Sequence, residues 1–234
     1  MSVKLNDKRL LAAATLGRSG KRFADIGTDH AYLPIYLIQS GRSPEGLATD
    51  VRDGPVASAV RNISASGLED KITVAKRDGL DLIVGFAPDD IYILGMGGEL
   101  IRDIISASDY VKRHGVRLIL QPMTRQEILR TYLYKSGFQA VDETLVRSQG
   151  RIYQLTAVEY TGVCEELSDV EALLGKINIE RGGDLLREYA ARLARQRRRA
   201  ADGASKAGNG ADDLYRIARE LEIIAGISAS AIDN

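Results

Sequence analysis

The 234-residue sequence contains a single cysteine, Cys164, and only two histidines, His30 and His114. One thiol excludes disulfide frameworks and every Cys-x-x-Cys metal or redox motif, and two imidazoles are too few for the usual zinc clusters. No apolar run approaches the roughly 18 residues of a membrane span, and the N-terminus lacks the apolar core of a signal peptide. The sequence therefore predicts a soluble, cytoplasmic protein with no bound metal and no membrane association.

The sequence also has no net charge at pH 7, because its 32 lysines and arginines balance its 32 aspartates and glutamates. The totals give no reason to expect a polyanionic partner, although they say nothing about local patches. With 44% hydrophobic and 27% charged residues, the composition is that of an ordinary globular protein. The length allows one sizeable core and a smaller appendage.

Residues 1–160 alternate short apolar runs with amphipathic stretches, which is typical of a βαβ sheet domain. The apolar runs predict five parallel strands, within residues 21–27, 45–50, 71–79, 89–98 and 116–122. Helices are predicted at residues 5–17, 32–41, 53–67, 99–108 and 124–138. Residues 139–150 and 151–160 alternate with period two about a Ser-Gln-Gly turn and predict an antiparallel hairpin.

Five parallel strands followed by a hairpin favour an α/β, Rossmann-like sheet of the class I methyltransferase type, in which the last strand inserts antiparallel. A nicotinamide-binding domain would ordinarily continue with parallel βαβ units.

Residues 161–234 carry no strand pattern and predict a helical second domain. Ser168 and Glu171 have the spacing of a capping box. After Gly182 and Gly183, two apolar stripes separated by a small-residue turn at 202–212 predict a coiled-coil-like helical hairpin.

The segment D-I-G-T-D-H-A-Y-L-P, residues 25–34, is the first candidate site, because ligands of open α/β sheets bind beyond the carboxyl ends of the strands. Gly27 permits a tight turn and close approach of a ligand. Pro34 suits the first helical position, which leaves residues 28–32 as a loop. The alternative is a plain strand–turn–helix with Asp29 as a helix cap. The glycine pattern of dinucleotide sites is missing here.

Two further aspartates follow the next strands. Asp50 lies 23 residues after Gly27, which suits a carboxylate that binds ribose hydroxyls. Asp78 could accept a hydrogen bond from an adenine amino group. Each could instead be a cap or turn residue. Together with Asp25 they form the arrangement that an S-adenosylmethionine site needs.

The G-M-G-G segment, residues 95–98, is predicted to be a loop of bare backbone amides beside the donor, although its glycines could simply allow the turn into the next helix. His30 could contact the ligand or the target base, or be structurally bonded. His114, in a polar loop, is expected to be solvated.

These motifs together resemble the bacterial tRNA (adenine-22-N1)-methyltransferase family, TrmK. The similarity rests on A-D-I-G-T-D-H-A-Y-L-P, the D-G-P at 53–55, I-L-G-M-G-G, and I-L-Q-P followed by L-R-x-x-L-Y-x-x-G-F. The similarity is strong over residues 1–160, whereas the helical tail is similar only in the arrangement of its predicted helices.

The resemblance implies a catalytic domain at residues 1–160 that binds S-adenosylmethionine, and a helical domain at 161–234 that contacts tRNA. The expected donor-binding residues are Asp25, Gly27, Thr28, Asp50, Val51, Asp78, Gly79, Gly95, Met96 and Gly97. It leaves the oligomeric state open, with a monomer among the options.

The lone pair on adenine N1 is free at neutral pH, so catalysis needs positioning and stabilisation of an adenine that becomes cationic. Asp29 is the expected carboxylate, and His30 and Tyr32 are expected to grip the base. The base must be unpaired or flipped out to react, because N1 lies on its pairing edge.

Residues 187–199 contain six arginines and one acid, Glu188. Arg192, Arg195 and Arg199 fall on the helix face opposite Leu186 and Leu193, which predicts an outer basic stripe for RNA phosphates, unless it is merely solvated. Arg197 falls within the apolar stripe and must snorkel or find a partner. Arg125, Arg130 and Lys135, on the helix after the fifth strand, could extend this basic surface.

Three alternatives remain: a methyltransferase for another RNA or a small molecule, a nicotinamide-dependent oxidoreductase, and a non-catalytic RNA-binding module. The missing glycine motif and the terminal hairpin argue against the oxidoreductase. A small-molecule substrate would leave the arginine-rich helix unexplained.

Overall fold

The computed structural model describes residues 5–207 and 210–227. The chain divides into two compact units, and the boundary lies between Glu165 and Glu166. Each unit has its own arrangement of secondary structure.

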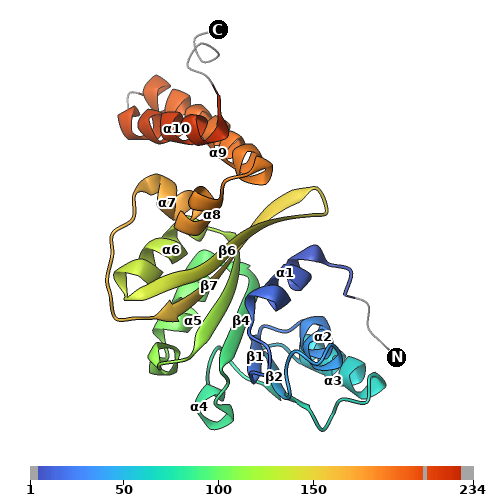
Figure 1. The fold of residues 1–234 in the computed structure, drawn as a ribbon. Helices are drawn as coiled ribbons and strands as arrows, with labels where there is room; N and C mark the ends of the chain where they lie inside the picture. The colour runs from blue at the N-terminus through green and yellow to red at the C-terminus, as the bar shows by residue number, and fades with distance from the viewer. Residues whose placement is uncertain (1–4, 208–209, 228–234) are drawn as a thin grey trace. The chain divides into compact units, whose positions relative to one another are not determined.

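The first unit is built on a seven-stranded sheet with the order β3-β2-β1-β4-β5-β7-β6 (Figure 1). The first five strands along the chain pair in parallel, whereas β7 pairs antiparallel with both β5 and β6. The strands are β1 (Phe23–Ile26), β2 (Gly46–Asp50), β3 (Ile72–Lys76), β4 (Asp90–Gly97), β5 (Arg117–Thr124), β6 (Phe138–Ser148) and β7 (Arg151–Tyr160). The prediction of a parallel sheet closed by an antiparallel hairpin is confirmed.

Helices cover both faces of this sheet. Buried side chains of the strands alternate between two apolar clusters, so that Tyr92 packs in one while its neighbours Ile91 and Ile93 pack in the other. The cluster around Tyr92 includes residues of α1 (Lys8–Leu16), α2 (Tyr32–Gln39) and α3 (Asp53–Ala65). The other cluster includes residues of α4 (Ile83–Phe86), α5 (Gly98–Ser106), η1 (Asp109–Lys112) and α6 (Gln126–Lys135).

Two turns next to the predicted site differ from expectation. Helix α2 begins at Tyr32, because Ala31 adopts a left-handed conformation (φ 56°) directly before it, and Pro34 is the third helical residue. A proline is tolerated there because the first-turn N–H groups have no intrahelical partner. The segment at 95–98 is not a loop: β4 continues to Gly97 and α5 starts at Gly98, and the pairing of β4 with β5 shifts register around Met96.

The second unit is helical, with α7 (Asp169–Leu174), α8 (Lys176–Arg181), α9 (Asp184–Lys206) and α10 (Asp212–Ala225). The predicted capping box at Ser168 and Glu171 is present at the start of α7. Helices α9 and α10 pack against each other and are joined by an ion pair between Arg198 and Glu222. The predicted turn at 202–212 is wrong in its first half, since α9 continues through Gly203.

Among the described residues, no helix is both long enough and apolar enough to cross a membrane.

Candidate functional site

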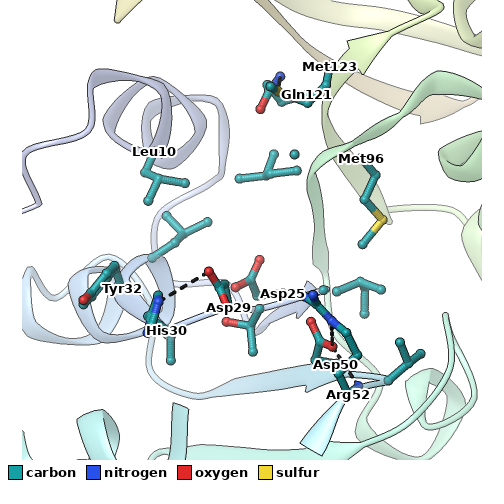
Figure 2. Close-up of a pocket in the computed structure, with 18 of the residues that line it drawn as sticks. Leu10, Asp25, Asp29, His30, Tyr32, Asp50, Arg52, Met96, Gln121 and Met123 are labelled. Atoms are coloured by element: carbon teal, nitrogen blue, oxygen red, sulfur yellow. Dashed lines mark hydrogen bonds and ion pairs between the residues drawn. The ribbon is translucent and has the colours of Figure 1, made fainter. Parts of the chain in front are cut away.

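A cavity of about 1030 Å³ opens where β1 to β5 end. The loops after β1, β2 and β3, the ends of β4 and β5, and the first turn of α1 contribute its walls. Figure 2 shows side chains from these separate elements converging on one space. The volume is at the upper end of the range of about 300–1,000 Å³ for ligand pockets, which leaves room for more than one ligand group.

Most residues predicted for a donor site line this cavity. They are Asp25, Gly27, Thr28, Asp50, Val51, Asp78, Gly79, Gly95 and Met96. Gly97 does not line it, because this residue is the N-cap of α5 and faces Thr124 of β5 instead. The candidate catalytic residues Asp29, His30 and Tyr32 line the same cavity.

Asp50 ends β2 with its side chain only 4% exposed. Oδ1 accepts a hydrogen bond of 2.8 Å from the backbone N–H of Arg52 and lies 3.3 Å from Nε of the same residue. The other oxygen, Oδ2, has no partner among residues 5–207 and 210–227. A buried carboxylate with one free oxygen beside a cavity is suited to accept a hydrogen bond from a ligand hydroxyl.

Asp25 lies on the neighbouring strand β1 and is also buried at the cavity wall. The pKa of its carboxyl group is raised to about 6, chiefly by burial; Thr28 lowers this pKa and the negative charge of Asp50 raises it. A cationic ligand in the cavity would favour the ionised form of Asp25.

Gly27 brings the chain close to the end of β4. It has a φ of 78°, and a Cβ added there would lie 2.1 Å from Cε of Met96. The backbone N–H groups of Gly27 and Thr28 both donate to the carbonyl of Thr49 at 2.8 Å, so they are not available to a ligand. Gly27 therefore allows the chain after β1 to lie close to Met96, and its N–H group does not serve as a donor to a ligand.

The three candidate catalytic residues form one group at the cavity. Nε2 of His30 lies 3.4 Å from Oδ2 of Asp29, and Nδ1 lies 2.7 Å from Oγ of Ser58. The imidazole stacks on Tyr32, with ring centroids 5.3 Å apart and an angle of 24° between the planes. Side-chain exposure of 68% for Asp29 leaves its carboxylate accessible to a substrate.

The sequence did not reveal the residues that α1 and β5 contribute. Asn6, Asp7, Arg9 and Leu10 line the cavity from the start of α1, and Gln121 and Met123 line it from β5. Gln121 belongs to the I-L-Q-P motif, which was the only signal for it. The role of α1 depends on its packing against β6 and β7, which are distant in sequence.

In the second unit, Arg192, Arg195 and Arg199 are exposed on α9, whereas Leu186 and Leu193 are buried. The guanidinium of Arg192 lies 4.8 Å from the centroid of the Tyr189 ring.

Two other arginines singled out in the sequence are buried in part or in full. Arg197 is half-buried, and its Nε has no hydrogen-bond partner among the described residues. Arg130 is buried against Glu143 and Gln154, which corrects the expectation that it extends an exposed basic surface.

Within the described part of the chain, no group of three or more His, Cys, Asp or Glu side chains could hold a metal ion.

Comparisons with known proteins identify the family of the chain. A family model described as "Methyltransferase domain" matches residues 6–156. The tRNA (adenine(22)-N(1))-methyltransferase of Bacillus subtilis is 38% identical over 152 residues, which is 65% of this chain and 64% of that relative. The chain thus aligns with slightly less than two thirds of the curated relative's length.

Solved structures match over nearly the whole chain. The crystal structure of the B. subtilis m1A22 tRNA methyltransferase TrmK has a TM-score of 0.80 at 29% identity, covering 98% of this chain and 99% of that one. The Streptococcus pneumoniae protein Sp1610, a candidate tRNA (m1A22) methyltransferase solved with S-adenosyl-L-methionine, has a TM-score of 0.81 at 31% identity, with 92% and 98% coverage. The chain therefore belongs to the methyltransferase-domain family and, within it, to the TrmK family.

Proposed function

We propose that this chain transfers a methyl group from S-adenosylmethionine to N1 of adenine 22 in the D-arm of tRNA, which yields 1-methyladenosine. The observation that carries the proposal is that Asp25, Asp50 and Asp78, at the carboxyl ends of three successive strands, line one cavity. The activity named for the B. subtilis relative and the donor bound to the S. pneumoniae protein support the same reaction.

The residues present fit the donor. The free Oδ2 of buried Asp50 matches the ribose hydroxyls, and exposed Asp78 matches the adenine amino group. Asp25 supplies negative charge for a cationic ligand. When bound, S-adenosylmethionine supplies an electrophilic methyl group on a sulfonium, and the protein residues hold it in line with the acceptor.

The acceptor nitrogen needs no general base, because its lone pair is free at neutral pH. As N1 accepts the methyl group, the adenine becomes cationic, and the carboxylate of Asp29 stabilises that charge. His30 and Tyr32 hold the base, since the stacked pair presents aromatic surface at the cavity and Ser58 fixes the imidazole.

The exposed arginines of α9, Arg192, Arg195 and Arg199, contact tRNA phosphates. The reaction takes place in the cytoplasm on a base that leaves its stack.

Two measurements test the proposal against its alternatives. S-adenosylmethionine should raise the melting temperature of the protein, whereas NAD should not, and the reverse result would favour an oxidoreductase. Labelled methyl groups should enter unmodified tRNA but not free adenosine. Incorporation into adenosine alone would favour a small-molecule methyltransferase, and no incorporation would favour a binding module.

A further inference from the structure

Gln121, at the carboxyl end of β5, is a polar side chain that the donor site does not use. It pairs with Leu94 of β4, and it lines the cavity although the residue is only 1% exposed. A polar group at such a position needs hydrogen-bond partners, either from the protein or from a ligand.

The amide of Gln121 is held in one orientation. Its Nε2 donates to the carbonyl of Pro122 at 3.1 Å and lies 3.3 Å from Sδ of Met123. A flipped amide would place its oxygen against the Pro122 carbonyl, which is also an acceptor, so the observed orientation is favoured. Oε1 then accepts no hydrogen bond from the described residues, and Figure 2 shows this amide at the cavity wall.

The position of Gln121 separates it from the donor-binding acids. In the sheet order β3-β2-β1-β4-β5, Asp78, Asp50 and Asp25 follow or end the first three strands, and Gln121 lies on the far side of β4. A donor that spans β3 to β4 leaves the β5 side of the cavity for the acceptor base. Leu10 of α1 and Met123 provide apolar surface in this part of the cavity (Figure 2).

We propose that Gln121 is a specificity-determining residue whose Oε1 accepts a hydrogen bond from the exocyclic amine of the target adenine. This inference rests on the proposed function. The amine is adjacent to N1, so the bond would orient N1 towards the methyl group. Guanine carries a carbonyl oxygen at the same place, and two acceptors would face each other. Positive charge that develops on N1 spreads to the amine and strengthens the bond during methyl transfer.

The test uses tRNA transcripts with either adenosine or purine riboside, which lacks the amine, at position 22. The ratio of kcat/KM for the two transcripts is measured for the full-length wild type and for Gln121→Met. We expect loss of the amine to lower kcat/KM about 10-fold more in the wild type than in the variant, because the variant has no acceptor to leave unpaired. Comparing the two ratios cancels the intrinsic difference in nucleophilicity between the bases.

A control variant completes the experiment. Gln139→Met removes an amide of β6 that bonds to the carbonyl of Val163 outside the cavity, and it should retain the wild-type ratio. All variants should bind S-adenosylmethionine as the wild type does.

An unchanged ratio in Gln121→Met, with normal donor binding, would overturn the assignment. If the wild type makes no 1-methyladenosine in the adenosine transcript, the proposed function itself fails, and the role of Gln121 fails with it. That result is seen before any variant is compared, so the two failures are distinguishable.

Discussion

Oδ1 of Asp50 accepts a 2.8 Å hydrogen bond from the backbone N–H of Arg52, which leaves Oδ2 available to a ligand at the cavity. Asp50→Asn can keep the first bond but presents an amide donor in place of the free oxygen. We expect this variant to bind S-adenosylmethionine about 10- to 100-fold more weakly, as measured by isothermal titration calorimetry. Asp53→Asn, at an 86% exposed side chain on α3, is the matched control and should bind normally. Equal affinity in both variants would remove Asp50 from the donor site.

The raised pKa of Asp25 predicts a pH-dependent stability. Folding raises this pKa from 3.8 to about 6, so the ionised form is disfavoured in the native state without ligand. The protonated carboxyl group of Asp25 therefore contributes fully to the free energy of unfolding below about pH 4. This contribution, about 3 kcal/mol in total, is lost as the pH rises through about 6. Unfolding in urea at pH 4 and pH 7 measures this loss. Between the two pH values, the wild type should lose about 3 kcal/mol of unfolding free energy relative to Asp25→Asn, whose amide does not titrate. A difference independent of pH would contradict the assigned environment of Asp25.

Asp29 tests the electrostatic part of the proposed mechanism. Asp29→Asn should lower kcat at saturating tRNA and donor by at least about 10-fold, because the neutral amide stabilises the cationic adenine less well. The affinity for S-adenosylmethionine should be unchanged. Asp103→Asn, on the exposed face of α5, serves as a control and should keep full turnover. Full turnover in Asp29→Asn would show that another group stabilises the charge.

The exposed arginines of α9 test the tRNA contact. Reversal of Arg192, Arg195 and Arg199 to glutamate should weaken tRNA binding by about 10-fold or more and reduce its dependence on salt. Donor affinity should not change. Filter binding at several salt concentrations measures both effects.

A control for this charge reversal is available near the amino ends of strands in the first unit. Lys21, Lys71 and Lys112 lie just before β1, at the start of β3 and before β5, away from the cavity. Their reversal to glutamate changes the net charge equally and should leave tRNA binding near the wild-type value. If both triple variants lose the same affinity, the effect is one of net charge and not of a stripe on α9.

The buried pair of Arg130 and Glu143 predicts a large effect on stability. Nε of Arg130 lies 3.0 Å from Oε1 of Glu143, and the side chains are 5% and 0% exposed. Glu143→Gln should lower the unfolding free energy by about 3–5 kcal/mol, because it removes the negative charge that lies 3.0 Å from the buried guanidinium. The double variant Arg130→Met with Glu143→Leu should recover most of this loss. No recovery in urea unfolding would show that other contacts of the pair dominate.

Local signals in the sequence were sufficient for most of the fold. The box of Ser168 and Glu171 caps α7, and the period-two pattern after residue 138 forms the antiparallel hairpin, both as predicted. The strand-end acids converge because parallel strands bring their carboxyl ends to one edge, which the alternation of strands and helices already implied.

The errors arose where tertiary packing decides. Gly203 does not end α9, because contacts with α10, including the hydrogen bond from Tyr215 to Asp202, support the additional turn. The sequence gives no sign that Arg130 is buried, since its partners Glu143 and Gln154 lie on the later hairpin. Gln121 likewise gains its significance only from the neighbours that fix its amide.

The most direct test of the account is the site of methylation in tRNA. Unmodified transcript is incubated with the protein and S-adenosylmethionine, and the modified nucleoside is identified and mapped by mass spectrometry of nuclease fragments. The account predicts one 1-methyladenosine per molecule, at position 22, and none in a transcript with guanosine at that position. Methylation at another atom or position, or none in the presence of bound donor, would contradict it.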